Sequence, residues 1–250
     1  MSTPAGIALT VEGLSVRFGG VVALDGVDLE VRIGSRHGVL GPNGSGKTTL
    51  FNAISGLNKP SAGTIALLGM DVTSVSSHAR ARMGLARTFQ ITSLFPSLTV
   101  HENVAMSARV FNGSDRGFWR PSTRQQDANT IAGEMLERLG LSHLSGRPLR
   151  AIGYGEQRQL EIAVALATGP SVLLLDEPTA GLSSAETMGL TRLVRAMPGE
   201  LTVLIIEHDL GVIFELTDHL TVLQNGKRIA DGPSAAIRED PIVRAVYFGR

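Results

Sequence analysis

The features that this 250-residue sequence lacks already narrow its chemistry. It contains no cysteine, which excludes a disulfide framework and any cysteine-based metal site. Its 23 basic side chains balance 23 acidic ones, so it has no basic field of the kind that nucleic-acid binding usually needs. Its six histidines show no H-x-x-x-H spacing and no clustered carboxylates, so we predict no metal site built from protein side chains alone.

Long apolar segments are also missing. No apolar run approaches the roughly 20 residues needed to span a bilayer, and residues 1–5 lack the charged and apolar segments of a signal peptide. We find no internal repeat and no low-complexity segment. The sequence therefore predicts a cytoplasmic protein with a sizeable core, forming one large domain or two small ones, that reaches a membrane only through a partner.

The most informative motif is a glycine-rich segment that fits the pattern G-x-x-x-x-G-K-[ST]. It consists of Gly41, Pro42, Asn43, Gly44, Ser45, Gly46, Lys47, Thr48 and Thr49. Glycines allow such a loop to turn its backbone N–H groups inward around phosphates. Lys47 supplies a positive charge and Thr48 a hydroxyl for Mg²⁺. A short strand over 36–40 and a helix over 46–56 complete the context, because the helix directs its positive end at the same anion.

A second motif is an apolar strand, residues 172–177, that ends in two acids. In a phosphate-loop ATPase the first acid, Asp176, holds Mg²⁺ directly or through water. The second acid, Glu177, is the candidate general base that polarises the attacking water. The alternative is an acidic strand end facing solvent, which the phosphate loop upstream and the segment 178–182 downstream disfavour.

Apolar spacing predicts an α/β chain interrupted by helices. Strands are expected over 8–11, 14–18, 27–33, 63–68, 171–175 and 202–206, with hairpin turns at Asp25-Gly26 and Asn225-Gly226. Capping boxes at Thr99–Glu102 and Ser183–Glu186 predict helices to about residues 110 and 197. Apolar positions between 131 and 139 predict a helix that Gly140 ends, residues 112–121 predict a loop, and residues 154–167 predict a largely buried helix. We expect a helical insert over 91–153.

Five segments follow one another in the order typical of ABC transporter ATPase subunits. They are the phosphate loop, Gln90, the signature-like segment 152–157, the acid-ended strand and His208. The sequence resembles this family over nearly its whole length. The resemblance implies a single domain, 1–250, with a P-loop NTPase core over 1–90 and 154–232. This core combines a mixed sheet, flanking helices and an N-terminal antiparallel β subdomain, and the helical insert and tail helices over 233–250 complete the chain.

The resemblance also implies a role for each matched residue. Phe18 stacks on adenine, where the family more often has tyrosine. Gln90 senses Mg²⁺ and the attacking water and couples them to the membrane subunit. His208 contacts the γ-phosphate. Residues 180–183 form the dimer-contact loop, and the residues that face the nucleotide of a second subunit are Gly153, Tyr154, Gly155 and Glu156. Taken alone, Phe18 could belong to the core, Gln90 to the surface, and His208 to an ordinary strand end.

Further segments are similar to the ATPases of branched-chain amino-acid importers, namely residues 18–24, 102–104, 154–158 and 160–163. The Arg-Thr-Phe-Gln form at 87–90 is similar to the longer of the two ATPase subunits of those importers. ATP and Mg²⁺, transmembrane permease subunits, a second and different ATPase chain, and indirectly a solute-binding protein are the implied partners. The implied location is the cytoplasmic face of the plasma membrane. Urea and short-amide importers are close relatives and stay open as alternatives. A soluble ABC protein acting on ribosomes or DNA, a weakly catalytic regulatory subunit, and a small-molecule kinase are less favoured.

Two positions depart from the family pattern. Gly153 stands where the signature has a serine whose hydroxyl contacts the γ-phosphate, a hydrogen bond worth roughly 1.5–3 kcal/mol. We expect backbone N–H groups near Gly155 to face the phosphate instead. Ser183 stands where the dimer-contact loop usually has aspartate, and we expect it to cap the next helix. The basic residues Arg80, Arg82 and Arg87 read either as a solvated face or as contacts with a membrane partner.

Overall fold

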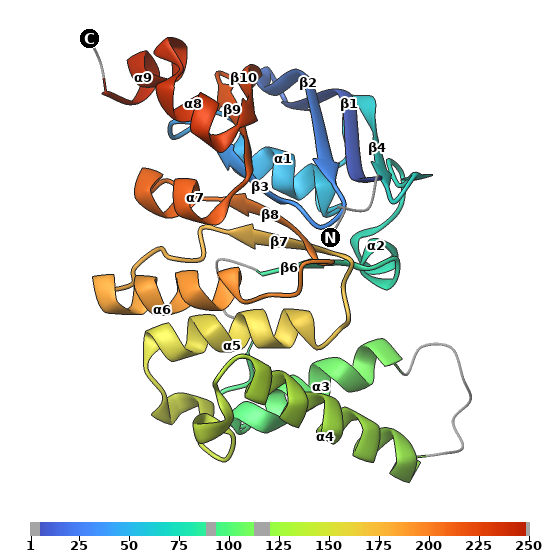
Figure 1. Cartoon of the computed structure of the whole chain (residues 1–250). Helices are drawn as coiled ribbons and strands as arrows, with labels where there is room; N and C mark the ends of the chain where they lie inside the picture. The colour runs from blue at the N-terminus through green and yellow to red at the C-terminus, as the bar shows by residue number, and fades with distance from the viewer. Residues whose placement is uncertain (1–5, 89–93, 113–120, 249–250) are drawn as a thin grey trace. The chain divides into compact units, whose positions relative to one another are not determined.

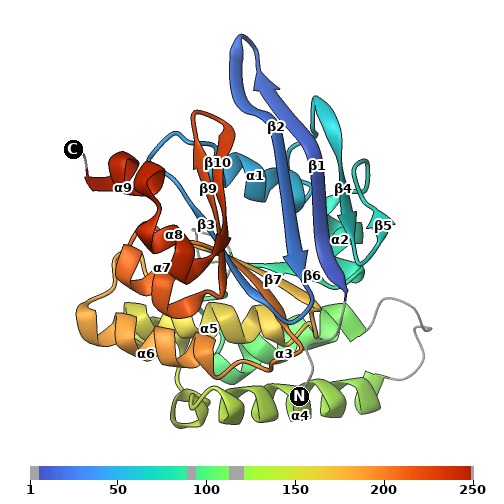
Figure 2. The same cartoon turned by 45° about the horizontal axis from the view of Figure 1, so that its top comes forward.

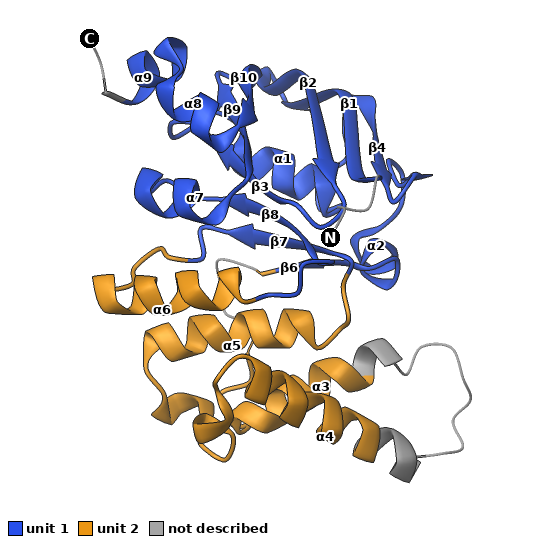
Figure 3. Ribbon diagram, in the orientation of Figure 1, with its two compact units in different colours: residues 1–87, 171–178, 197–250 blue, residues 88–170, 179–196 orange. Residues whose placement is uncertain are grey.

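The computed structural model describes the backbone of residues 6–88, 94–112 and 121–248. The chain forms two compact units, shown in Figure 3. The first comprises residues 1–87, 171–178 and 197–250, and the second comprises residues 88–170 and 179–196. Within the described residues, no helix is long and apolar enough to cross a membrane.

The first unit contains an antiparallel sheet in the order β2-β1-β4-β5. Its strands are β1 (Ile7–Phe18), β2 (Val21–Arg32), β4 (Ala62–Leu67) and β5 (Met70–Asp71). Leu24, Val27, Leu29 and Val31 of β2 are buried and exposed residues separate them, so one face of the sheet is buried. The N-terminal antiparallel β subdomain is confirmed.

The hairpin turn predicted at Asp25-Gly26 is wrong. β2 runs through these residues, and the turn that joins β1 to β2 lies at Gly19-Gly20 instead. Gly26, at φ 66°, occupies a break in the β1–β2 register, and its N–H donates to the Ser15 hydroxyl oxygen at 3.0 Å. An Asp-Gly pair suits a β-bulge as well as a turn, because both need a residue with positive φ.

The second sheet of this unit is mixed and has the order β10-β9-β3-β8-β7-β6 (Figure 1). Its strands are β3 (Arg36–Leu40), β6 (Leu85–Arg87), β7 (Val172–Asp176), β8 (Thr202–Ile206), β9 (His219–Gln224) and β10 (Lys227–Pro233). All neighbours are parallel except β9 and β10, which the predicted Asn225-Gly226 turn joins, with both residues at positive φ. Every residue of β7 and β8 is buried, as expected for central parallel strands.

The helices of this unit are α1 (Lys47–Ile54), α2 (Ser77–Arg82), α7 (Leu210–Leu216), α8 (Ser234–Glu239) and α9 (Pro241–Phe248). Leu50, Phe51 and Ile54 of α1 belong to one buried core with residues of both sheets, and Figure 2 shows α1 beside the antiparallel strands. The predicted strand and helix on either side of the glycine loop are therefore confirmed.

Arg80 is almost fully buried, so its reading as part of a solvated face is wrong. Its Nη1 donates to the carbonyl oxygens of Ala53 and Ile54 at 2.7 and 2.6 Å, at the C-terminal end of α1. A guanidinium suits this position because the last carbonyls of a helix lack backbone partners and carry partial negative charge.

The second unit is helical. It contains α3 (Val100–Asn112), α4 (Pro121–Arg138), α5 (Tyr154–Leu166), α6 (Ser184–Arg195) and two short 3₁₀ turns, Ser142–Leu144 and Leu149–Ala151. The capping box at Thr99 is confirmed, because the Thr99 N–H donates to Glu102 Oε2 at 2.8 Å and the Glu102 N–H donates to the Thr99 hydroxyl at 3.2 Å. Gly140, at φ 72°, follows α4 as predicted. Most of the predicted loop over 112–121 lies outside the described residues.

The helical unit is larger than the predicted insert of 91–153. Leu160, Ala163 and Ala167, from α5 and its C-terminal end, share one buried core with Val104 and Leu136 of the preceding helices. α6 also belongs to this unit. The helical unit therefore extends past residue 153, where the sequence changes character, because the apolar face of α5 packs with the preceding helices.

Candidate nucleotide-binding site

The glycine loop lies between the end of β3 at Leu40 and the start of α1 at Lys47. Gly46 has a φ of 105°, and a Cβ atom there would lie 2.6 Å from Leu24 Cδ2 and 2.7 Å from the Ala23 carbonyl oxygen. Only glycine fits this position without displacing β2. The loop is also held from the β9–β10 turn, where the Gly226 N–H donates to the Ser45 carbonyl oxygen at 3.0 Å.

Lys47 points back into the loop. Its Nζ donates to the carbonyl oxygens of Gly41 and Pro42 at 2.7 and 3.1 Å, and the residue is 6% exposed. Burial lowers the pKa of the Lys47 ammonium, and the charges of Glu177 and Asp176 act in the opposite direction. The lysine of the glycine motif and the two acids of the apolar strand therefore lie in one electrostatic environment.

Asp176 ends β7 and is buried. Its Oδ2 accepts a hydrogen bond from Arg87 Nη2 at 2.7 Å, whereas its Oδ1 is buried and has no hydrogen-bond partner among the described residues. Carboxylate oxygens and hydroxyls are preferred ligands of Mg²⁺. The residues present fit this ion, because Asp176 offers an unused oxygen and Thr48 is exposed in the first turn of α1.

Arg87 is a residue of this site that sequence reasoning misread. Besides pairing with Asp176, its Nη1 donates to Asn52 Oδ1 at 2.8 Å and to the Ser55 hydroxyl at 2.9 Å. Neither a solvated face nor a contact with a membrane partner describes this buried guanidinium. The signal in the sequence was an arginine at the end of a short apolar segment. That segment is β6, which pairs in parallel with β7 and brings Arg87 beside the acid-ended strand.

Glu177 has an unusual backbone. Its φ is 47°, a left-handed conformation that a non-glycine residue adopts at a cost of about 1–3 kcal/mol and that is concentrated at functional sites. Its N–H donates to the Ile206 carbonyl oxygen at 2.9 Å, which holds the turn after β7 against the end of β8. His208 Nδ1 lies 3.9 Å from Glu177 Oε2, and both side chains are partly exposed, at 59% and 29%.

Phe18 and Gln90 are the remaining residues that the sequence predicted for this site. Phe18 ends β1 with 51% of its surface exposed, so its alternative reading as a core residue is wrong. The strand that follows it, β2, adjoins the glycine loop at Ala23. Gln90 lies outside the described residues.

The signature-like segment belongs to the helical unit. Gly153 is the N-cap residue of α5, and its N–H donates to Glu156 Oε2 at 2.8 Å. The Gly155 N–H donates to Glu186 Oε1 at 3.2 Å. Tyr154 is 45% exposed, and its hydroxyl donates to the Ala180 carbonyl oxygen at 3.4 Å.

Comparison with known families shows which family the chain belongs to. A family model described as ABC transporter matches residues 24–180. The chain belongs to the ABC transporter family. The predicted family and fold class are thereby confirmed.

Curated relatives of this ABC-family chain match it over nearly its full length. It is 39% identical to the high-affinity branched-chain amino acid transport ATP-binding protein BraF of Pseudomonas aeruginosa, over 96% of this chain and 97% of the relative. It is 40% identical to the corresponding protein LivG of Escherichia coli K12, with the same two shares covered.

Among solved structures, an ATP-binding cassette of an ABC transporter in its ADP conformation superimposes with a TM-score of 0.84. That cassette is 31% identical to this chain, and the match covers 98% of this chain and 99% of the other. The similarity therefore extends to the fold of the whole chain.

Two backbone N–H groups of the signature segment, those of Gly153 and Gly155, donate to carboxylates in this ABC-family chain. That N–H groups near Gly155 face a phosphate of a second subunit stays a prediction. The predicted capping of α6 by Ser183 and Glu186 is confirmed, and Glu186 has a further contact. It accepts from the Ser183 N–H at 2.9 Å and the Ser183 hydroxyl at 2.6 Å, and it also reaches α5 through Gly155. One side chain thus links the signature segment to the segment 180–183.

Proposed function

We propose that this chain is the ATP-hydrolysing subunit of a membrane importer for branched-chain amino acids, acting as a peripheral subunit at the cytoplasmic face of the plasma membrane. The grouping of Lys47, Asp176, Glu177 and His208 around one glycine loop carries the ATPase part of the proposal. The solute is suggested by the relatives BraF and LivG, whose names give branched-chain amino acid transport.

ATP binds with its phosphates in the glycine loop. Backbone N–H groups of residues 44–49 and the positive end of α1 face the β- and γ-phosphates. Lys47 exchanges its contacts with the loop carbonyls for phosphate oxygens. The exposed ring of Phe18 stacks on the adenine.

Hydrolysis transfers the γ-phosphoryl group to water. Glu177 accepts a proton from the attacking water, and His208 donates a hydrogen bond to the γ-phosphate from its position beside Glu177. The Lys47 ammonium stabilises the charge that develops on the phosphoryl oxygens. Gln90 keeps the role that the family resemblance implies, sensing the water and signalling to the membrane subunit.

Thr48 and Asp176 would hold Mg²⁺, the first through its hydroxyl and the second through the oxygen that Arg87 leaves unused. When bound, this ion neutralises charge on the β- and γ-phosphates. Arg87 fixes the orientation of the Asp176 carboxylate, so that its free oxygen is presented in one direction.

The active form is a head-to-tail pair with a second ATPase chain. Residues 153–156 lie in the helical unit and the glycine loop in the other unit. By the family resemblance, each signature segment faces the γ-phosphate bound by the partner. Glu156 and Glu186 must then yield the Gly153 and Gly155 N–H groups to that phosphate.

Substituting Gly153 by serine tests this arrangement. A Cβ atom at Gly153 meets only Glu156 Oε2, at 3.7 Å, so the side chain fits. The new hydroxyl restores a charge-assisted hydrogen bond worth roughly 1.5–3 kcal/mol. We expect the KM for ATP of the assembled transporter to fall by about tenfold or more, with little change in ATP binding by the isolated chain.

Gly155→Ser is the matched control. A Cβ atom there would lie 2.5 Å from Glu186 Oε1, so this substitution should impair ATP hydrolysis by the assembled transporter. An unchanged KM in Gly153→Ser, or an equal change in the isolated chain, would argue against contact with a partner's nucleotide.

Uptake measurements test the solute. We expect a strain lacking this chain to lose most uptake of radiolabelled leucine and to keep uptake of urea, and the wild-type chain to restore it. Lys47→Ala should fail to restore leucine uptake, because the phosphates lose their positive partner. Loss of urea uptake with normal leucine uptake would replace the solute and leave the ATPase proposal standing. Normal uptake of both would contradict the importer proposal.

A further inference from the structure

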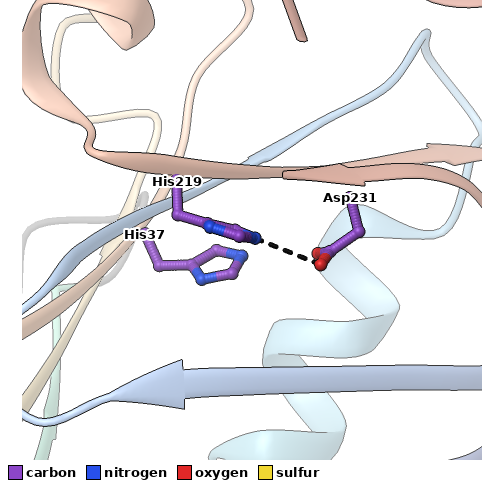
Figure 4. Close-up of side chains that lie close together, drawn as sticks. All are labelled: His37, His219 and Asp231. Atoms are coloured by element: carbon purple, nitrogen blue, oxygen red, sulfur yellow. Dashed lines mark hydrogen bonds and ion pairs between the residues drawn. The ribbon is translucent and has the colours of Figure 1, made fainter. Parts of the chain in front are cut away.

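A cluster of metal-ligating side chains lies in the β-rich unit, away from the glycine loop's own residues. His37, His219 and Asp231 come from β3, β9 and β10 and point toward one another (Figure 4). One potential ligand atom from each residue lies within 4.8 Å of the others. The three residues are far apart in the sequence, which predicts no such site, and only the pairing of β3 with β9 and of β9 with β10 brings them together.

We propose that His37, His219 and Asp231 form a binding site for Zn²⁺. Two imidazoles and one carboxylate are a typical zinc ligand set, with a fourth position for water. Mg²⁺ and Ca²⁺ are disfavoured because they prefer oxygen ligands alone.

The spacing of the cluster suits this ion. Tetrahedral ligands at about 2.0–2.2 Å from zinc lie roughly 3.3 Å apart. His219 Nε2 and Asp231 Oδ2 are already 3.1 Å apart, in a mixed hydrogen bond and ion pair. The two histidine rings lie with their centroids 4.8 Å apart. Binding therefore requires the ligand atoms, which lie up to 4.8 Å apart, to approach one another by as much as roughly 1.5 Å.

The surroundings of His37 favour coordination. The residue is 1% exposed, so the surrounding strands hold its ring in place and keep it away from bulk water. Thr221 is fully buried; it bonds to His37 Nε2 at 2.8 Å and donates to Asp231 Oδ1. Zinc bound at Nε2 replaces the first contact, while the second continues to orient the Asp231 carboxylate.

One member of the cluster borders an open pocket. Asp231 lines a pocket of about 410 Å³ between β1, β2 and β10, whose other charged residues are Glu12, Asp28, Glu30 and Arg228. Four carboxylates against one guanidinium give this pocket a negative potential that attracts cations. His219 and Asp231 are each about one-third exposed, so an ion can reach them.

Bound zinc links strands that support the phosphate loop. β3 leads directly into that loop, and the turn between β9 and β10 donates a hydrogen bond to Ser45 within it. Joining β3, β9 and β10 through one ion therefore stabilises the folded unit. The effect appears as a rise in the thermal unfolding midpoint on addition of Zn²⁺.

Isothermal titration of the full, untagged and nucleotide-free chain with zinc chloride tests the site. We expect one Zn²⁺ per chain, and a dissociation constant at least about tenfold weaker in His219→Gln and in Asp231→Asn. Both substitutions keep a polar side chain of similar size at a partly exposed position. Circular dichroism melts without zinc establish that each variant is folded. If only one of the two variants folds, the zinc titration of that variant tests the site.

Two control variants place the ion. His143→Gln removes an exposed histidine from the helical unit, and His208→Gln removes the histidine beside Glu177. Neither should alter the zinc isotherm. Absence of one-to-one binding by the wild-type chain, equal binding in His219→Gln and Asp231→Asn, or loss of binding in His208→Gln would each overturn the proposal.

Discussion

Glu177→Gln is expected to remove nearly all ATP turnover while ATP binding stays at the wild-type level. Glutamine has the shape of glutamate but cannot accept the proton of the attacking water, and a positioned general base contributes about 10²–10⁴-fold to a rate. The glycine loop and Lys47 are untouched, so the phosphates keep their partners. Steady-state phosphate release and equilibrium binding of a fluorescent ATP analogue measure the two properties separately.

The position of Glu177 supports this expectation. Its left-handed backbone, held by the hydrogen bond to Ile206, directs the residue from the end of β7 toward His208. Glu200→Gln, at an exposed acid before β8, is the matched control and should leave turnover unchanged. Turnover in Glu177→Gln within a factor of three of wild type would eliminate Glu177 as the base.

Locally determined features were predictable from the sequence. Gly41–Thr49, the capping boxes at Thr99 and Ser183, and the turn at Asn225-Gly226 each depend on residues a few positions apart. The apolar strands β7 and β8 were equally clear, since central parallel strands are buried along their whole length. These features were enough to predict an α/β chain and to select Lys47 and the two acids as site residues, whereas the ABC-type fold class came from the family resemblance.

Features that depend on tertiary packing were not predictable in this way. The side chain of Arg80 reaches the end of α1, and Arg87 reaches Asp176 across two paired strands, yet in sequence both look like surface charges. Asp25-Gly26 suits a turn and a bulge equally, and only the pairing of β1 with β2 decides between them. The His37 cluster likewise exists only after three strands have paired.

Arg87→Met is expected to lower the free energy of unfolding by about 3–5 kcal/mol, the largest stability effect we predict. The Arg87 and Asp176 side chains are 7% and 1% exposed and 2.7 Å apart. Removing one partner of a buried ion pair leaves the other charge without compensation, and that loss exceeds the net worth of the pair. The hydrogen bonds to Asn52 and Ser55 disappear as well. Urea denaturation followed by circular dichroism measures the change.

A double-mutant cycle separates the charge from the packing. Asp176→Asn removes the carboxylate charge that Arg87→Met leaves without a partner, so the double variant should be more stable than the sum of the two single effects predicts. Arg82→Met is the control, because Arg82 is exposed. It should change the free energy of unfolding by no more than about 0.5 kcal/mol. Additive single effects would mean that Arg87 acts through Asn52 and Ser55 alone.

The same variant connects stability to the active site. If Arg87 fixes the Asp176 carboxylate, then Arg87→Met protein that is still folded should bind Mg²⁺-ATP more weakly than wild type, while binding of ATP without Mg²⁺ changes less. Asn52→Ala provides the comparison, because it removes one hydrogen bond from Arg87 and leaves the ion pair in place. Equal weakening with and without Mg²⁺ would assign Arg87 to the fold alone. A selective loss would make this arginine the residue that orients the carboxylate, an assignment that the glycine motif and the acid-ended strand do not contain.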